Sequence, residues 1–110
     1  MSQKLSFTLP FGETKVISAD TILFIQTSAK PHKIEVHTLT EQFEVNASLY
    51  SIMYHLPSSF LKCSQSCLVN MDQILSIKKT ENLLLLSDGT TCYFSRNYKK
   101  AVFNYFLQKN

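Results

Sequence analysis

The stretch FLKCSQSCLVNMDQI at residues 60–74 carries the pattern that decides the fold. Apolar runs at residues 60–61 and 67–69 flank a short polar segment that contains Lys62, Ser64 and Gln65. Short apolar runs around a polar segment predict strands joined by a loop, which displays its hydrogen-bonding side chains on a rigid sheet. The stretch FSRNYKK at residues 94–100 has a similar layout, with an apolar residue followed by polar and basic ones.

Working outward from these stretches, short segments with alternating apolar and polar residues predict strands along most of the chain. The predicted strands span residues 5–9, 15–17, 21–26, 33–38, 42–45, 60–62, 67–69, 74–77, 82–86 and 92–94. Residues 21–26 are apolar almost throughout, which indicates a central strand. Residues 87–90, with Gly89, predict a hairpin turn.

Two helices are predicted within this strand-rich pattern. The first begins at Ser48 as N-cap and stops at Pro57. Its apolar positions recur at helical spacing at Leu49, Ile52, Met53 and Leu56. The second is capped by Ser95 and closes the chain, with an apolar stripe at Ala101, Val102, Tyr105 and Phe106. The fold class is therefore mainly β, with one short internal helix and a C-terminal helix.

Composition limits the classes of protein. A chain of 110 residues with 45% hydrophobic content fits one domain over residues 1–110. The net charge of +3 is mildly basic and permits a polyanionic partner. No long apolar run and no signal-peptide pattern is visible, so we expect a cytoplasmic protein without a membrane partner. The three cysteines form an odd set, which agrees with a reducing compartment.

Catalytic and metal-binding patterns are weak. His32, His37 and His55 lie in different predicted elements, and no glycine-flanked serine or cysteine offers a strained nucleophile. The Cys-x-x-x-Cys spacing of Cys63 and Cys67 differs from that of a zinc finger, and buried structural thiols are the simpler interpretation. We therefore expect no enzyme, no metal and no cofactor.

Three predicted loop segments, at residues 29–33, 62–66 and 95–100, each combine a cation with a side chain able to contact a base. The candidate base readers are His32, Gln65 and Arg96, and Arg96 is the only arginine of the chain. Its planar fork fits guanine O6 and N7, whereas Gln65 fits adenine. The candidate phosphate contacts are Lys30, Lys33, Lys62, Ser64, Ser66, Asn97, Tyr98, Lys99 and Lys100. Composition alone favours ordinary solvated turns for these segments.

Residues 60–74 resemble the central signature of LytTR DNA-binding domains, the output modules of many bacterial response regulators. The shared order is a bulky apolar pair, a basic residue, a short polar group with serine, then Leu-Val-Asn and Ile. Residues 20–25, 48–49, 86–89 and 95–98 match further motifs in the same order, so the resemblance covers nearly the whole chain. Within the family the chain is most similar to regulators of the accessory-gene, peptide-quorum type, because His32, Cys63, Cys92 and Arg96 fall at matching places.

The resemblance implies an elongated, mostly antiparallel β fold whose loops enter successive major grooves of double-stranded DNA and bend it. His32, Gln65 and Arg96 match the positions that read bases. Family members often carry histidine or asparagine where this chain has Ser64 and Gln65, so no target sequence is transferred. The resemblance further implies promoter repeats bound by two copies. No receiver domain is present in the 110 residues, so a receiver is an expected partner if the chain is part of a longer regulator.

Two further hypotheses stay open at this point. Cys63 and Cys92 each adjoin a candidate DNA-contacting segment, so they form a candidate redox pair if their strands are neighbours, although two buried thiols are the default. From another class of function, a protein-interaction β domain would use the same segments against an acidic partner, with no nucleic acid involved.

Overall fold

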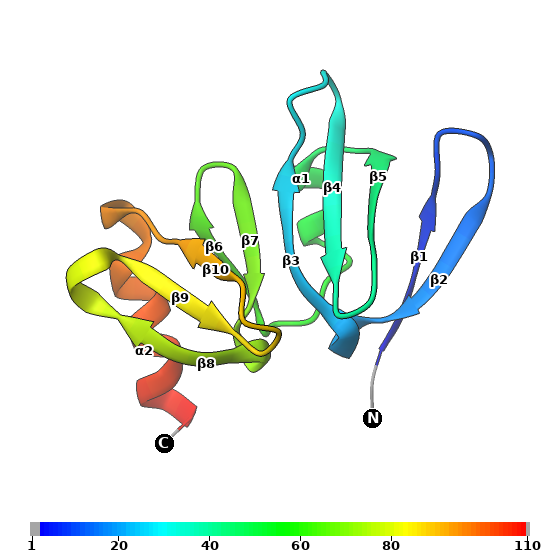
Figure 1. Cartoon of the computed structure of the whole chain (residues 1–110). Coiled ribbons are helices and arrows are strands. Elements are labelled where there is room, and N and C mark those ends of the chain that lie inside the picture. The colour runs from blue at the N-terminus through cyan, green and yellow to red at the C-terminus, as the bar shows by residue number, and fades with distance from the viewer. Residues whose placement is uncertain (1–2, 110) are drawn as a thin grey trace.

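A computed structural model describes residues 3–109 and confirms a mainly β protein built from three antiparallel sheets (Figure 1). The first sheet pairs β1 (Lys4–Thr8) with β2 (Thr14–Ser18). The second has five strands in the order β5-β4-β3-β7-β6. These are β3 (Ile22–Thr27), β4 (Lys33–Thr38), β5 (Gln42–Asn46), β6 (Phe60–Ser64) and β7 (Cys67–Asn70). The third has the order β10-β9-β8, from β8 (Ile74–Lys78), β9 (Leu83–Leu86) and β10 (Thr91–Tyr93).

The central strand predicted at residues 21–26 is β3, which pairs with β4 on one side and β7 on the other. Both faces of β3 and β7 are covered, which explains their nearly continuous apolar sequence. Leu68 of β7 packs into one apolar cluster, and its neighbour Val69 packs into a second. Ile22 and Ile25 share a face because a register shift between Ile22 and Phe24 interrupts the period of two.

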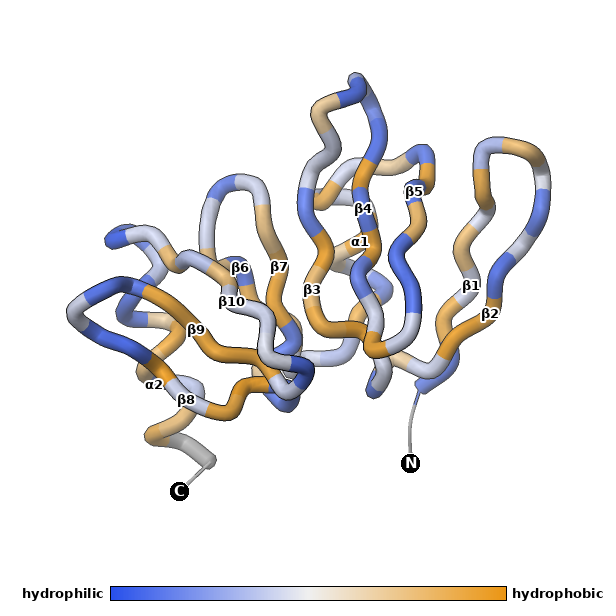
Figure 2. Tube along the Cα trace, viewed as in Figure 1, coloured by the Kyte–Doolittle hydropathy of each residue, from blue (hydrophilic) through white to orange (hydrophobic). Residues whose placement is uncertain are grey.

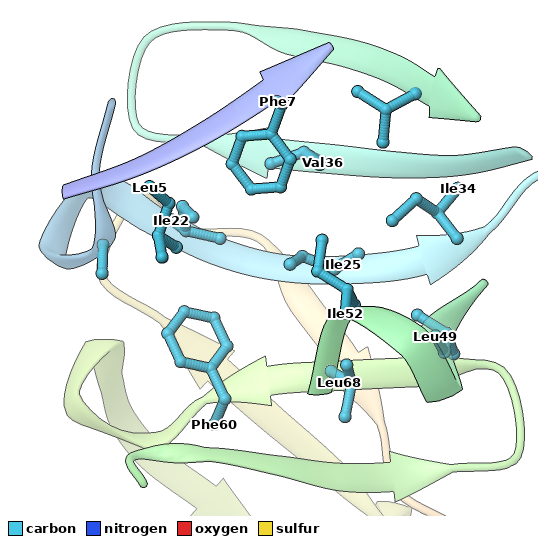
Figure 3. Close-up of a cluster of buried hydrophobic side chains, with 12 residues drawn as sticks. Leu5, Phe7, Ile22, Ile25, Ile34, Val36, Leu49, Ile52, Phe60 and Leu68 are labelled. Carbon is cyan, nitrogen blue, oxygen red and sulfur yellow. The ribbon is translucent and has the colours of Figure 1, made fainter. Parts of the chain in front are cut away.

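The first apolar cluster joins the five-stranded sheet to β1 and to the short helix α1 (Leu49–Met53). Figure 3 shows Leu49 and Ile52 of α1 lying over the sheet near Ile25 and Leu68. The second cluster lies between the five-stranded sheet, the three-stranded sheet and α2 (Lys99–Lys109), and includes Phe94, Val102 and all three cysteines. Two clusters side by side give an elongated molecule, 42 Å along its longest axis and 25 Å along its shortest.

The internal helix is shorter than predicted. Ser48 caps it as expected, accepting a hydrogen bond from the Ser51 N–H at 3.1 Å, but α1 ends at Met53 rather than at Leu56. After Met53 the chain forms a tighter turn, in which the Leu56 N–H donates to Met53 O three residues back. The physical reason is Pro57, because a residue that precedes proline is disfavoured in helical conformation.

The start of the C-terminal helix also differs from the prediction. Ser95 makes no side-chain capping bond and precedes a 3-10 turn, η4 (Arg96–Tyr98), after which α2 begins at Lys99. The backbone of Ser95, and not its side chain, makes the hydrogen bonds at this point. Its N–H donates to Cys63 O at 2.8 Å, and its carbonyl accepts from the Tyr98 N–H at 3.0 Å. Arg96 and Asn97 therefore lie in a short rigid turn between β10 and α2.

One buried polar side chain fastens the sheet at the end where β3 begins and β7 finishes. Asn70 is buried, and its side-chain N–H donates to Ile22 O at 2.9 Å. Its side-chain oxygen accepts from the Asp72 N–H at 3.1 Å, so both ends of the amide are satisfied. Among the described residues, no helix is long and apolar enough to cross a membrane.

Candidate nucleic-acid interface

The three segments predicted to contact DNA lie along one edge of the molecule, here called the basic edge. It comprises the β3–β4 loop, the β6–β7 turn and the β10–α2 connection, which lie in the upper part of Figure 1 together with the β1–β2 loop. Backbone hydrogen bonds join them in series: the Thr27 N–H donates to Ser66 O at 2.9 Å, and the Ser95 N–H donates to Cys63 O at 2.8 Å. The spacing of the three segments is therefore set by the backbone.

His32 is the last residue of the β3–β4 loop, directly before β4, and has a left-handed conformation with φ of 60°. Histidine is among the residues that adopt this region more readily than most, yet the conformation needs support from the surrounding structure. The His32 carbonyl supplies it by accepting a hydrogen bond from the Ala47 N–H at 3.2 Å. The backbone of His32 is thus fixed where the loop enters β4, and its imidazole is exposed.

Two of the candidate phosphate contacts in this segment have partners within the protein. Lys30 Nζ lies 3.3 Å from Glu44 Oε1, and Lys33 Nζ donates to Asn46 Oδ1 at 3.0 Å. Hydrogen bonds from Ser28 and Lys30 hold the pKa of the Glu44 carboxyl below its ordinary value. Both lysines are therefore held close to β5, and Lys30 is partly neutralised.

The middle segment is shorter than predicted. Strand β6 runs to Ser64, so Lys62 and Ser64 lie on the strand and only Gln65 and Ser66 form the turn. The physical reason is the hairpin itself, because Ser64 pairs with Cys67 directly across the turn. Gln65 and Ser66 are exposed at the end of this hairpin, where an amide side chain is free of neighbouring strands.

Lys62 connects the middle segment to the third one. Its ammonium nitrogen lies 5.8 Å from the centre of the Tyr98 ring, within the range of a cation–π contact. Arg96 and Asn97 are exposed beside it in the η4 turn. Residues assigned as phosphate contacts from sequence regions more than thirty positions apart thus meet at this point of the basic edge.

The candidate base readers are unengaged by the protein. Across residues 3–109, the side chains of His32, Gln65 and Arg96 make no hydrogen bond or ion pair with another residue. Figure 2 shows hydrophilic residues at the tips of the β3–β4 loop and the β6–β7 turn, above the largely hydrophobic strands β3 and β7. The edge therefore offers a guanidinium, an amide and an imidazole to a partner without first breaking internal contacts.

The three thiols gather beneath this edge. Cys63 and Cys67 lie on the two strands of the β6–β7 hairpin, Cys92 lies on β10, and all three are buried in the second apolar cluster. Hydrogen bonds with Cys63 and Cys92, together with burial, raise the pKa of the Cys67 thiol. Cys67 is a buried neutral thiol, as predicted, and it contacts both members of the candidate redox pair.

Sequence reasoning missed Lys79 in the β8–β9 turn. Its ammonium group lies over the Phe103 ring, and the ammonium group of Lys99 makes a cation–π contact with the same ring. Residues 78–82 show no pattern that separates them from an ordinary solvated turn. The turn lies near the third segment only because β8 pairs with β9 and α2 packs in the second apolar cluster.

The fold and this edge define a class of protein: a β-rich domain that carries basic and polar side chains on the loops and turns at one edge. The sequence model of the LytTr DNA-binding domain matches residues 12–106, and the chain belongs to this family. As a member, it is a DNA-binding domain of the kind found in bacterial transcriptional regulators, and the family is not enzymatic, as expected from the sequence.

Individual relatives agree with this assignment. The chain is 31% identical to accessory gene regulator protein A of Staphylococcus epidermidis over 85 residues, which are 76% of the chain and 35% of the relative. It is 32% identical to accessory gene regulator protein A of Staphylococcus aureus strain N315 over 85 residues, again 76% of the chain and 35% of the relative. The matched region thus spans about a third of these relatives.

A solved structure supports the fold. The LytTr DNA-binding domain of a Bacillus cereus protein described as a methyl-accepting/DNA response regulator superimposes with a TM-score of 0.76. The superposition covers 94% of this chain and 95% of that one at 23% sequence identity. The elongated antiparallel fold implied by the resemblance is therefore confirmed.

Proposed function

We propose that the chain binds DNA sequence-specifically by placing the three segments of the basic edge in successive major grooves. In this proposal His32, Gln65 and Arg96 read base edges. The observation that carries it is that these three side chains are exposed on separate, backbone-linked segments and make no hydrogen bond or ion pair within the described protein. Arginine and glutamine form the bidentate contacts that distinguish guanine and adenine in the major groove.

The remaining candidates would hold the phosphates and set the register. Lys62, Lys99 and Lys100 are available for this role as they stand, with Ser64, Ser66, Asn97 and Tyr98 as neutral donors. Before they could bind a phosphate, Lys30 would have to leave Glu44 and Lys33 would have to leave Asn46. We therefore assign most of the non-specific affinity to the middle and third segments.

The relatives suggest the setting in which this binding is used. We propose that residues 1–110 act as one DNA-binding domain in the cytoplasm, and that two copies cooperate on direct or tandem promoter repeats. Accessory gene regulator protein A is about three times as long as the matched region. A receiver domain, in the same polypeptide or a separate one, is the proposed source of regulatory input.

Selection from random duplex DNA tests the function directly. Folded protein should enrich one motif, and a tandem arrangement should be preferred over a single half-site. No enrichment of any motif by folded protein would overturn the proposal. Salt-sensitive binding to acidic proteins without any DNA preference would favour the alternative of a protein-interaction β domain, since electrostatic attraction alone does not distinguish the two.

We propose further that Cys63 and Cys92 act as a redox pair that alters the basic edge. Both are buried with Cys67 in one cluster directly behind the middle and third segments. A peroxide would oxidise two thiols to one disulfide while it is reduced to water or an alcohol plus water. Because the Ser95 N–H is bonded to Cys63 O, a shift of β6 toward β10 would move the segment that carries Arg96.

Mild peroxide treatment should therefore lower DNA affinity reversibly, and Cys92→Ser should remove the response. Cys67→Ala tests whether the third thiol takes part, because it contacts both partners. Unchanged affinity after both thiols of the pair are consumed would eliminate the redox role. It would leave the DNA-binding proposal intact.

A further inference from the structure

The β8–β9 turn carries a cation that the described interface does not use. Lys79 begins a 3-10 turn, η3 (Lys79–Glu81), and Asn82 closes it in a left-handed conformation with φ of 56°. The Asn82 carbonyl accepts a hydrogen bond from the Phe94 N–H at 3.0 Å, and the next residue, Ser95, is bonded to β6. The turn is therefore fastened to the root of the segment that holds Arg96.

Phe103 of α2 contacts both Lys79 and Lys99. The ammonium nitrogen of Lys79 lies 5.1 Å from the centre of the Phe103 ring, and that of Lys99 lies 5.9 Å from the same centre. The ring is in turn held by an edge-to-face contact with the buried Phe94, with centroids 6.0 Å apart. Two like charges are thus positioned over one ring that belongs to the core.

This pair lacks compensation by acidic groups. Among the described residues, neither Lys79 nor Lys99 forms an ion pair, although Glu81 is exposed in the same turn. Each exposed ammonium group can therefore attract a DNA phosphate. The β8–β9 turn thus presents a cation that has no acidic partner in the described part of the chain, next to the segment that carries Arg96.

We infer that Lys79 is an additional phosphate contact, which binds the backbone of the DNA duplex beyond the base pairs next to Arg96. The β8–β9 turn then extends the basic edge past the third segment, and Phe103 is the residue that positions Lys79 and Lys99. This inference rests on the proposed function, because it assumes that DNA lies along the basic edge. It enlarges the footprint without adding sequence specificity.

Measurement of affinity against salt concentration tests the inference on the selected duplex. Lys79→Met keeps the aliphatic stem over the ring and removes the charge. It should lower the slope of log K against log salt by about 1 and weaken binding about fivefold to tenfold at ~0.1 M salt. Lys4→Met, at an exposed position on β1 at the far side of the molecule, is the matched control and should change neither quantity.

A variant that is expected to strengthen DNA binding distinguishes a specific contact from a general distortion of the turn. Glu81→Gln removes the exposed acid beside the same phosphate and should tighten binding about twofold. If Lys79→Met leaves affinity and slope unchanged while thermal unfolding is normal, the inference is wrong. Equal weakening by both substitutions would point to a distorted turn and would also overturn it.

Duplex length locates the contact. Shortening the duplex on the side of the Arg96 contact should weaken wild-type binding, whereas Lys79→Met should be insensitive to the same truncation. Truncation on the opposite side should affect both proteins equally. Failure of wild-type protein to prefer any duplex would reject the proposed function itself, but wild-type preference with no coupling between Lys79 and duplex length would reject only the inference.

Discussion

The basic edge and the opposite edge of the sheets are built from the same strands but treat their polar groups in opposite ways. At the opposite edge, here called the closed edge, Asn70, Gln73, Ser87 and Thr38 donate or accept hydrogen bonds within the protein. At the basic edge, the side chains of His32, Gln65 and Arg96 make none among the described residues.

This difference separates residues that hold the fold from residues that remain available to a ligand. At the closed edge Asn70 and Thr38 are buried and must be paired, because an unpaired buried donor or acceptor costs about 1–3 kcal/mol. At the basic edge the side chains of His32, Gln65 and Arg96 are solvated and can bind a partner. The comparison predicts that substitutions at the closed edge change stability, and substitutions at the basic edge change DNA affinity.

The largest expected effect is at Asn70. Asn70→Ala removes the donor to Ile22 O and the acceptor for the Asp72 N–H in a buried position, so it should lower the free energy of unfolding by roughly 2–3 kcal/mol. Denaturant unfolding measures the loss. Asn97→Ala is the matched control on the basic edge, where the same substitution should change stability by less than about 0.5 kcal/mol. Equal destabilisation by both would contradict the comparison.

Arg96 should give the largest effect on binding. Arg96→Ala should weaken binding to the preferred duplex by roughly 1–3 kcal/mol and relax the preference at one base pair, with unfolding unchanged. Competition binding against duplexes that differ at single positions measures both quantities. A uniform loss across all sequences would assign Arg96 to a phosphate instead of a base.

Lys62 should affect all sequences alike. Lys62→Ala removes a cation held over the Tyr98 ring and should reduce the slope of log K against log salt by about 1. The loss should be the same for selected and unrelated duplexes. An unchanged salt slope would show that Lys62 serves packing against Tyr98 and does not contact DNA.

The smallest effect, and one of opposite sign, is expected at Glu44. Glu44→Gln breaks the ion pair that partly neutralises Lys30, so DNA should bind about twofold more tightly. Ser28 and Lys30 lower the pKa of Glu44, so the carboxylate stays charged through neutral and mildly acidic pH. The ratio of variant to wild-type affinity should therefore stay constant between pH 8 and about pH 6. Weaker binding by the variant would indicate that Glu44 orients Lys30 productively.

Much of the fold follows from local sequence pattern. Alternating apolar residues placed the strands within one or two positions, and the apolar sequence of residues 21–26 predicted the central strand, because both of its faces are buried. Features set by tertiary contacts were not predictable in the same way. The backbone bond from Ser95 to Cys63 displaced the start of α2. The early end of α1 is a local effect of Pro57, which acts further back along the helix than the apolar spacing indicated.

The candidate site likewise has one part that the local sequence indicates and another that depends on tertiary structure. Residue chemistry indicated His32, Gln65 and Arg96 from the sequence, since each combines exposure in a polar segment with a group that can contact a base. Their alignment along one edge depends on strand order, which local pattern does not encode. The sequence did not indicate Lys79, because its contact with the Phe103 ring, which Lys99 also contacts, depends on the packing of α2 against the three-stranded sheet.

Chemical-shift mapping with the selected duplex tests the central claim most directly. Addition of DNA to isotopically labelled protein should shift backbone amide signals of residues 29–33, 64–66 and 95–100, with residues 78–82 as the further extension. Signals of the closed edge, including Asn70 and Ser87, should stay unchanged. Shifts concentrated on the closed edge or on α1, with the basic edge unaffected, would contradict the account.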